Sequence, residues 1–132
     1  FHFLNLLFII FYIYPGSILG FIIYKDYTKQ PEITPDIIFL SSNHVYAFLL
    51  LSLVGFAGYQ TNRKNIIYYL FIISIVLELL HIVIPNRSFQ FSDLFGNIVG
   101  VLISLIIDSD FSIHKNMLLY LKYHGEVIVP YI

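Results

Sequence analysis

Glu78 and His81 are the side chains best suited to chemistry, because both exchange protons and they lie three residues apart in an apolar stretch. Ser74 and Pro85 extend the spacing by four residues on either side, so a helix places all four on one face. The glutamate suits a general acid or base, with the histidine adjusting its proton affinity. We therefore name Glu78 and His81 as catalytic candidates, without assigning a reaction.

A second polar stripe follows a short loop. Asp93, Asn97, Gly100 and Ser104 repeat the spacing of four, three and four, and Gly96 makes a GxxxG pattern that lets another helix approach closely. A short loop makes the two helices antiparallel neighbours, so we expect the two polar stripes to face each other.

An ionisable side chain at membrane depth costs on the order of 3 kcal/mol and needs a partner or a function. Arg87, in the loop between the stripes, is the nearest counter-ion for Glu78 or Asp93. These residues with His81 and Asn97 form what we call the polar cluster. It is interpreted either as a hydrogen-bonded clamp between two helices or as a site for a ligand head group or a proton. Asp93 also suits a helix N-terminus, where an acid stabilises the helix dipole.

We predict no metal site and no cofactor. A metal site needs at least three converging donors, and only Glu78 and His81 share a face at a suitable spacing. The chain has no cysteine, which excludes thiolate ligands, thiol nucleophiles and disulfides. The other histidines lie in the tail or near the ends of apolar segments, as interfacial side chains do: His2, His44, His114 and His124.

The composition predicts an integral membrane protein. Of 132 residues, 58% are hydrophobic and 11% are charged, whereas a soluble domain carries about 25% charged residues. The net charge is -1 and the basic residues are scattered, which excludes a nucleic-acid surface. Helical spans need about 20 apolar residues, and we expect an all-α bundle of about four: Phe1–Tyr24, Val45–Tyr59 preceded by Ser41–His44, Ile66–Ile84 and Leu94–Ile107.

The fourth segment is short, and the sequence does not decide whether it crosses fully. We divide the chain into a transmembrane domain at 1–110 and an interfacial amphipathic tail at 111–132. The compact turn with Arg63 and Lys64 favours cytoplasmic termini. Helix packing is expected at Gly16, Gly20, Gly96 and Gly100.

The polar pattern resembles the VanZ-like family of small membrane proteins. That family has Glu-x-x-Gln, then Pro-Gly-Arg, then Asp-x-x-x-Asn-x-x-Gly. The matching positions here are Glu78, Pro85, Arg87, Asp93, Asn97 and Gly100.

The chain departs from that family at three places. His81 replaces Gln, Asn86 replaces Gly, and Asn43-His44-Val-Tyr-Ala47 stands where the family has Asp-Lys-x-x-His. The last change puts any activity that depends on that motif in doubt. The resemblance implies a multi-pass protein of the bacterial cytoplasmic membrane and cell envelope, in a family named for a member linked to teicoplanin resistance. It implies no reaction.

Three functions follow as hypotheses. In the first, the polar cluster binds a lipid-linked or amphipathic molecule, or another membrane protein, at the outer leaflet, with a role like that in antibiotic resistance. In the second, the chain is a membrane-embedded enzyme acting on a lipid or cell-wall precursor, with Arg87 holding an anionic head group. In the third, it is a structural subunit of a larger membrane complex. We lean away from an enzyme.

Overall fold

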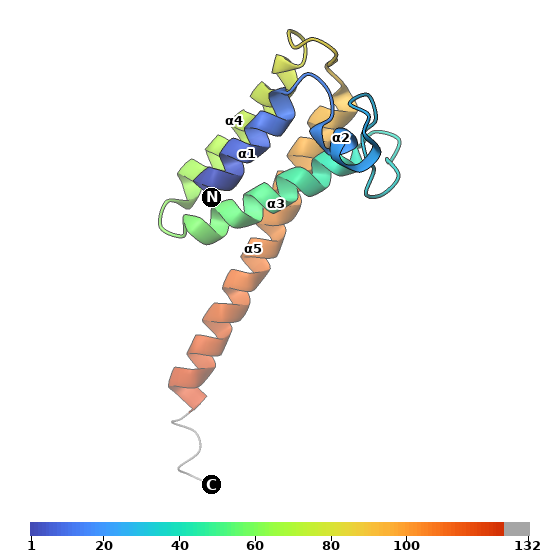
Figure 1. The fold of residues 1–132 in the computed structure, drawn as a ribbon. Helices are drawn as coiled ribbons and strands as arrows, with labels where there is room; N and C mark the ends of the chain where they lie inside the picture. The colour runs from blue at the N-terminus through green and yellow to red at the C-terminus, as the bar shows by residue number, and fades with distance from the viewer. Residues whose placement is uncertain (126–132) are drawn as a thin grey trace.

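The computed structural model describes residues 1–125. They form five α-helices and no named strand, so the prediction of an all-α protein is confirmed for the described part of the chain. In Figure 1, α1 lies beside α4, and α3 crosses the N-terminal half of α5. The helices are α1 (His2–Ile13), α2 (Ile18–Tyr24), α3 (Ser42–Gly58), α4 (Arg63–Leu80) and α5 (Phe91–Gly125).

The first predicted span is wrong as a single helix. The chain breaks between α1 and α2, whose axes differ by 83°. Pro15 causes the break, because a residue before proline avoids helical geometry and Tyr14 is extended at ψ 131°. Gly16 then turns the chain at φ +130°, a conformation that L side chains rarely adopt. Gly16 and Gly20 therefore do not share one helix face.

Gly20 has a different role from the one predicted. A Cβ at this position would lie 1.6 Å from the carbonyl oxygen of Lys29, so only glycine lets the loop after α2 cross this helix. Ser17 begins α2 as its N-cap, accepting a hydrogen bond at 2.9 Å from the Gly20 amide.

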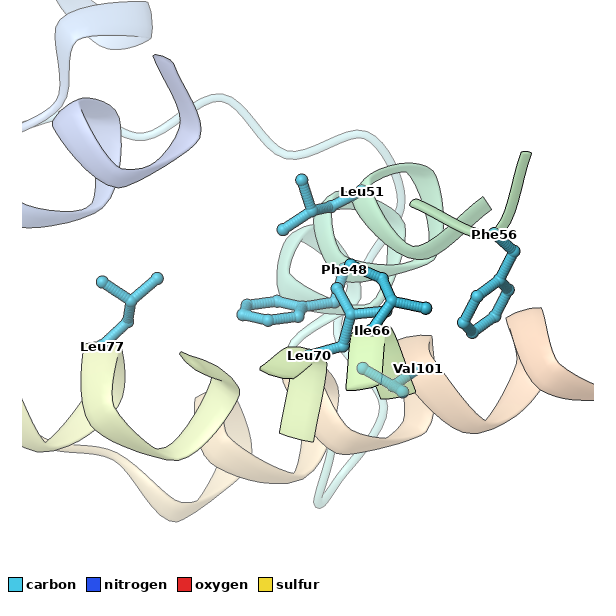
Figure 2. Packing of buried hydrophobic residues seen from close by; sticks show 7 residues of the cluster. All are labelled: Phe48, Leu51, Phe56, Ile66, Leu70, Leu77 and Val101. Carbon is cyan, nitrogen blue, oxygen red and sulfur yellow. The ribbon is translucent and has the colours of Figure 1, made fainter. Parts of the chain in front are cut away.

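The apolar core is small and lies where α3, α4 and α5 meet (Figure 2). Helices α3 and α4 each turn three apolar side chains fully inward and α5 turns one, whereas many other large apolar side chains of the described residues are exposed. Such an arrangement suits a protein whose outer surface contacts lipid or other apolar surfaces rather than water. The buried members are Phe48, Leu51 and Phe56 from α3, Ile66, Leu70 and Leu77 from α4, and Val101 from α5.

Two glycines set the distance between α3 and α5. A Cβ on Gly96 would lie 2.6 Å from the Ser41 carbonyl, and one on Gly100 would lie 2.5 Å from the Val45 carbonyl. Both glycines thus press the backbone of α5 against the start of α3. This contact carries His44, on the first turn of α3, to the polar face of α5.

Helix α5 continues through the predicted boundary at 110, and the division into a transmembrane domain and an interfacial tail stays a prediction. Helix α5 runs without interruption for 35 residues. No glycine or proline occurs from 108 to 124, so nothing in the local sequence ends the helix. Asp108, at the predicted end of the span, accepts a hydrogen bond at 2.5 Å from Arg63. Residues 126–132 of the predicted tail lie outside the described residues.

By length and composition, one described helix, Phe91–His124 of α5, can cross a membrane. Helices α1 and α2 meet the same criteria together, as one strongly bent pair. The structure is compatible with a small membrane protein, and a bundle of four spans stays a prediction. The far half of α5 extends away from the other helices (Figure 1).

Candidate functional site

Asn97 is the centre of a buried polar network that joins four helices. Its Nδ2 donates to the Ser74 carbonyl of α4 at 3.1 Å, so its Oδ1 is left as an acceptor. The Tyr12 hydroxyl of α1 donates to this Oδ1 at 2.5 Å, and Nδ1 of His44 on α3 lies 2.9 Å from it. Asn97 itself is completely buried, and every polar atom of its side chain has a partner.

These contacts determine the state of the His44 ring. Nδ1 faces an oxygen acceptor on Asn97 and also contacts the Tyr12 hydroxyl, whose own proton goes to Asn97. Nδ1 must therefore carry a hydrogen. The other ring nitrogen, Nε2, points to the Asp93 carboxylate and lies 3.5 Å from Oδ2.

Glu78 lies beside this network with no exposed surface. Its Oε1 accepts a hydrogen bond at 2.9 Å from the backbone amide of Gln90, in the loop that leads to α5. Its Oε2 is buried and has no hydrogen-bond partner, although Nδ1 of His81 lies 3.3 Å away. A buried carboxylate oxygen without a donor is costly, which makes it the most unusual atom of the site.

His81 is held mainly by α1. Its Nε2 lies 3.0 Å from the Tyr12 carbonyl, and its ring stacks on the Tyr12 ring with centroids 5.5 Å apart. Nε2 can bond to a carbonyl oxygen only as a donor, so it carries the hydrogen of the neutral ring. Nδ1 then has a lone pair, and it attracts the Glu78 carboxylate only when the ring is doubly protonated.

Arg87 does not pair with Glu78 or Asp93 as we expected. Its Nε donates to the Tyr14 carbonyl at 3.1 Å and its Nη2 to the Gly16 carbonyl at 2.6 Å. The break at Pro15 frees these carbonyls from helical bonding, and the planar guanidinium bridges them. Burial lowers the pKa of Arg87, which lies in the loop between α4 and α5. The residue holds the α1–α2 break against that loop.

A cavity of about 480 Å³ lies next to the network, between α1, α2, α3 and the 30–33 segment. Most of its lining is apolar, with a few polar groups at one side. Those nearest the network are Tyr12, His44, His81 and Arg87.

Two members of the site were missed from the sequence. Tyr12 carries no signal, because it is one of many aromatic residues in the first apolar segment. His44 was interpreted as an interfacial side chain, but it is buried and connects Asn97 to Asp93. The polar segment Ser-Ser-Asn-His, which interrupts the apolar run, was the available signal for a buried His44. Polar residues at the end of a span can point into the protein interior as well as toward the interface.

The chain is similar to the NADH-ubiquinone oxidoreductase chain 4L proteins of several fungi. It is 32% identical over 84 residues to NADH-ubiquinone oxidoreductase chain 4L of Talaromyces marneffei, covering 63% of this chain and 94% of the relative. The same protein of Trimorphomyces papilionaceus is 31% identical over 80 residues, covering 60% and 91%. That of Trichophyton rubrum is 31% identical over 84 residues, covering 63% and 94%. No protein-family profile and no solved structure matches the chain.

These relatives overturn the VanZ-like resemblance and what we inferred from it. The predictions of a bacterial cell-envelope protein, a role in antibiotic resistance and a bacterial cytoplasmic membrane are wrong, because the relatives are fungal oxidoreductase chains. The resemblance rested on six polar, proline and glycine positions, whereas the match to the fungal chains extends over 84 residues. Residues spaced three and four apart share one face of any helix, so polar residues at this spacing occur wherever two helices pack through polar faces. The spacing therefore does not identify a family.

Proposed function

Because this chain belongs to the family of NADH-ubiquinone oxidoreductase chain 4L, we propose that it is a membrane subunit of that enzyme. The observation that carries the proposal is how much of a relative the match includes. It covers 94% of the length of the relative in Talaromyces marneffei. The proposed location is the mitochondrial inner membrane. Of our three hypotheses, the structural subunit of a larger complex is the one that this family favours.

The surface of α5 supports a role in assembly. Its far half exposes large apolar side chains, including Phe111 at 71% and Tyr123 at 70%. A helix that is exposed and apolar on this scale requires either lipid or partner helices around it. In the proposed function, neighbouring subunits cover a large part of this surface. The exposed side chains that would meet them include Ile106, Phe111, Ile113, Leu118 and Leu121.

The hydrogen bonds inside the protein support a structural role for most residues of the polar cluster. Asn97, His81 and Arg87 all bind backbone carbonyls of other segments, which fixes how α1, α4 and α5 pack together. A rigid packing unit of this kind suits a small subunit that fills space between larger ones. Whether Glu78 and His81 also take part in chemistry stays a prediction.

Native electrophoresis of membranes that contain a tagged chain tests the proposal. Membranes are solubilised in a mild detergent, and the gel is stained for NADH oxidation and probed for the tag. We expect the tag to migrate with the band of NADH-ubiquinone oxidoreductase activity, and removal of the chain to lower the amount of that band. A tag found only at low mass, with the activity band unchanged in the deletion strain, would show the proposal to be wrong.

A further inference from the structure

Three donors from three helices converge at the polar site. His44 on α3, Glu78 on α4 and Asp93 on α5 each offer an atom, and these atoms lie within 4.8 Å of one another. Although the sequence alone led us to predict no metal site, we propose that these three residues form a binding site for a divalent first-row transition metal, with Zn²⁺ as its simplest occupant. Nothing in the proposed assembly function requires such a site, so the two proposals can fail separately.

The spacing of the donors is close to what a metal ion needs. A tetrahedral zinc ion with bonds of about 2.0–2.2 Å holds its ligand atoms about 3.4 Å apart. Nε2 of His44 and Oδ2 of Asp93 are already 3.5 Å apart. The three donor atoms, one from each residue, lie within 4.8 Å of one another, so coordination requires them to move closer together by roughly an ångström.

The protonation state of His44 is also the one that a ligand requires. Hydrogen bonding to Asn97 keeps the hydrogen on Nδ1, so in the neutral ring Nε2 presents a lone pair toward Asp93. A lone pair and a carboxylate repel each other unless a proton or a cation lies between them. Metal-binding histidines typically have this arrangement, with the second nitrogen donating to an oxygen that fixes the ring. Asn97 is therefore a positioning residue for His44.

Glu78 provides the second, independent observation. The side chain is completely buried, Oε1 is held by the Gln90 amide, and Oε2 has no hydrogen-bond partner. Nδ1 of His81 lies 3.3 Å from Oε2 and pairs with it only when that ring is doubly protonated. A bound cation would satisfy this oxygen and balance the two carboxylates, a task that Arg87 does not perform because it binds backbone carbonyls. When the His81 ring is neutral, this oxygen has no donor, and it therefore points to a positive ligand.

One imidazole and two carboxylates favour a particular class of metal. Nitrogen and oxygen donors together suit Zn²⁺, Fe²⁺ or Mn²⁺, whereas Mg²⁺ and Ca²⁺ prefer six or more oxygen ligands. Three protein ligands leave one coordination position for water or another molecule. Of the three ligands, His44 also lines the cavity of about 480 Å³.

The test uses the full-length chain in detergent micelles with any affinity tag removed, because polyhistidine binds metals. Bound zinc is counted by mass spectrometry after gel filtration, and the affinity is measured by titration calorimetry with Zn²⁺. We expect the wild type to bind one equivalent of zinc. Each of three variants, His44→Ala, Glu78→Gln and Asp93→Asn, should bind zinc with at least a tenfold weaker affinity. Binding that is not stoichiometric, or that these variants retain, would contradict the site.

Asp26→Asn and Asp108→Asn are the matched controls, because both remove a carboxylate outside the site. Asp26 lies in a loop, where hydrogen bonds from Thr28 lower its pKa, and Asp108 pairs with Arg63. Both controls should bind zinc like the wild type. A loss in the controls equal to that in the site variants would mean adventitious binding only.

A cobalt spectrum keeps the test decisive if a site variant does not fold. In the wild type, Co²⁺ in a four-coordinate site of nitrogen and oxygen donors should give an intense visible absorption that one equivalent of Zn²⁺ removes. A weak spectrum like that of the hydrated ion, unaffected by Zn²⁺, would overturn the proposal without any variant.

Discussion

The two halves of α5 make opposite use of their side chains. In the half packed against α3 and α4, Asn97, Val101 and Ser104 are buried, and polar atoms are bonded to specific partners. In the half beyond 106, large apolar side chains such as Phe111 and Leu118 are exposed. Among the described residues, buried polar side chains outnumber buried apolar ones. In this protein, specificity therefore comes from polar groups inside, and the apolar groups outside supply surface for lipid or partners.

Replacing Gly100 should have the largest effect on the packed half of α5. Gly100→Leu places a side chain where even a Cβ would lie 2.5 Å from the Val45 carbonyl and 2.9 Å from the Leu49 amide. We expect α3 and α5 to separate, with a loss of at least about 3 kcal/mol of stability and little monodisperse protein on gel filtration. Ser109→Leu, on the exposed half, should elute like the wild type. Equal behaviour of the two variants would show that the halves do not differ in packing.

Asn97→Ala should have the next largest effect. It removes the partner of the Ser74 carbonyl, the Tyr12 hydroxyl and Nδ1 of His44 at once. We expect a loss of about 2–4 kcal/mol in the free energy of unfolding, because several buried polar groups lose their hydrogen bonds. Zinc affinity should fall about 10–100-fold, as for other residues that orient a ligand.

Asn116→Ala is the matched control for Asn97→Ala, since Asn116 is exposed on the far half of α5. Its stability should stay within about 0.5 kcal/mol of the wild type. Thermal unfolding in micelles, followed by circular dichroism, measures both variants. A similar loss at both positions would contradict the central role that we assign to Asn97.

The two arginines, Arg63 and Arg87, should respond differently to replacement by lysine. Arg87→Lys removes a planar group that bridges the Tyr14 and Gly16 carbonyls, at an expected cost of about 1.5–3 kcal/mol. Arg63→Lys affects an ion pair with Asp108 in which the arginine side chain is 38% exposed, and it should cost about 0–1 kcal/mol. Thermal unfolding under identical conditions compares them. A larger loss for Arg63→Lys would reverse our ranking of the two sites.

The smallest effect on the isolated chain is expected on the exposed half of α5. The double variant Leu118→Ala, Leu121→Ala keeps an apolar surface and should leave the stability of the purified chain almost unchanged. If partner helices pack there, the same variant should reduce the assembled oxidoreductase on native gels several-fold. Ile72→Ala, Ile75→Ala on the exposed face of α4 is the comparison. Unchanged assembly in the α5 variant would locate the contact elsewhere.

Helix type and the polar stripes were predictable because they depend on local spacing. The third segment was expected at Ile66–Ile84 and is found as α4, Arg63–Leu80. Asn97 contacts the Ser74 carbonyl of α4, as two facing stripes require. Pro15 and Gly16 indicate the break in the sequence, whereas the length of the apolar run favours a single span. Proline and glycine in adjacent positions were the stronger signal.

By itself, the sequence determined an all-helical protein that is apolar outside, with Glu78, Asn97 and Asp93 placed by helical periodicity. Only the tertiary structure decided what those residues meet, because Tyr12, His44 and Asn97 lie on helices 32 to 85 residues apart in the chain. Periodicity fixes the face of a helix and carries no information about which distant helix packs there. The glycine contact between α3 and α5 makes that choice, and it brings His44 to the two carboxylates.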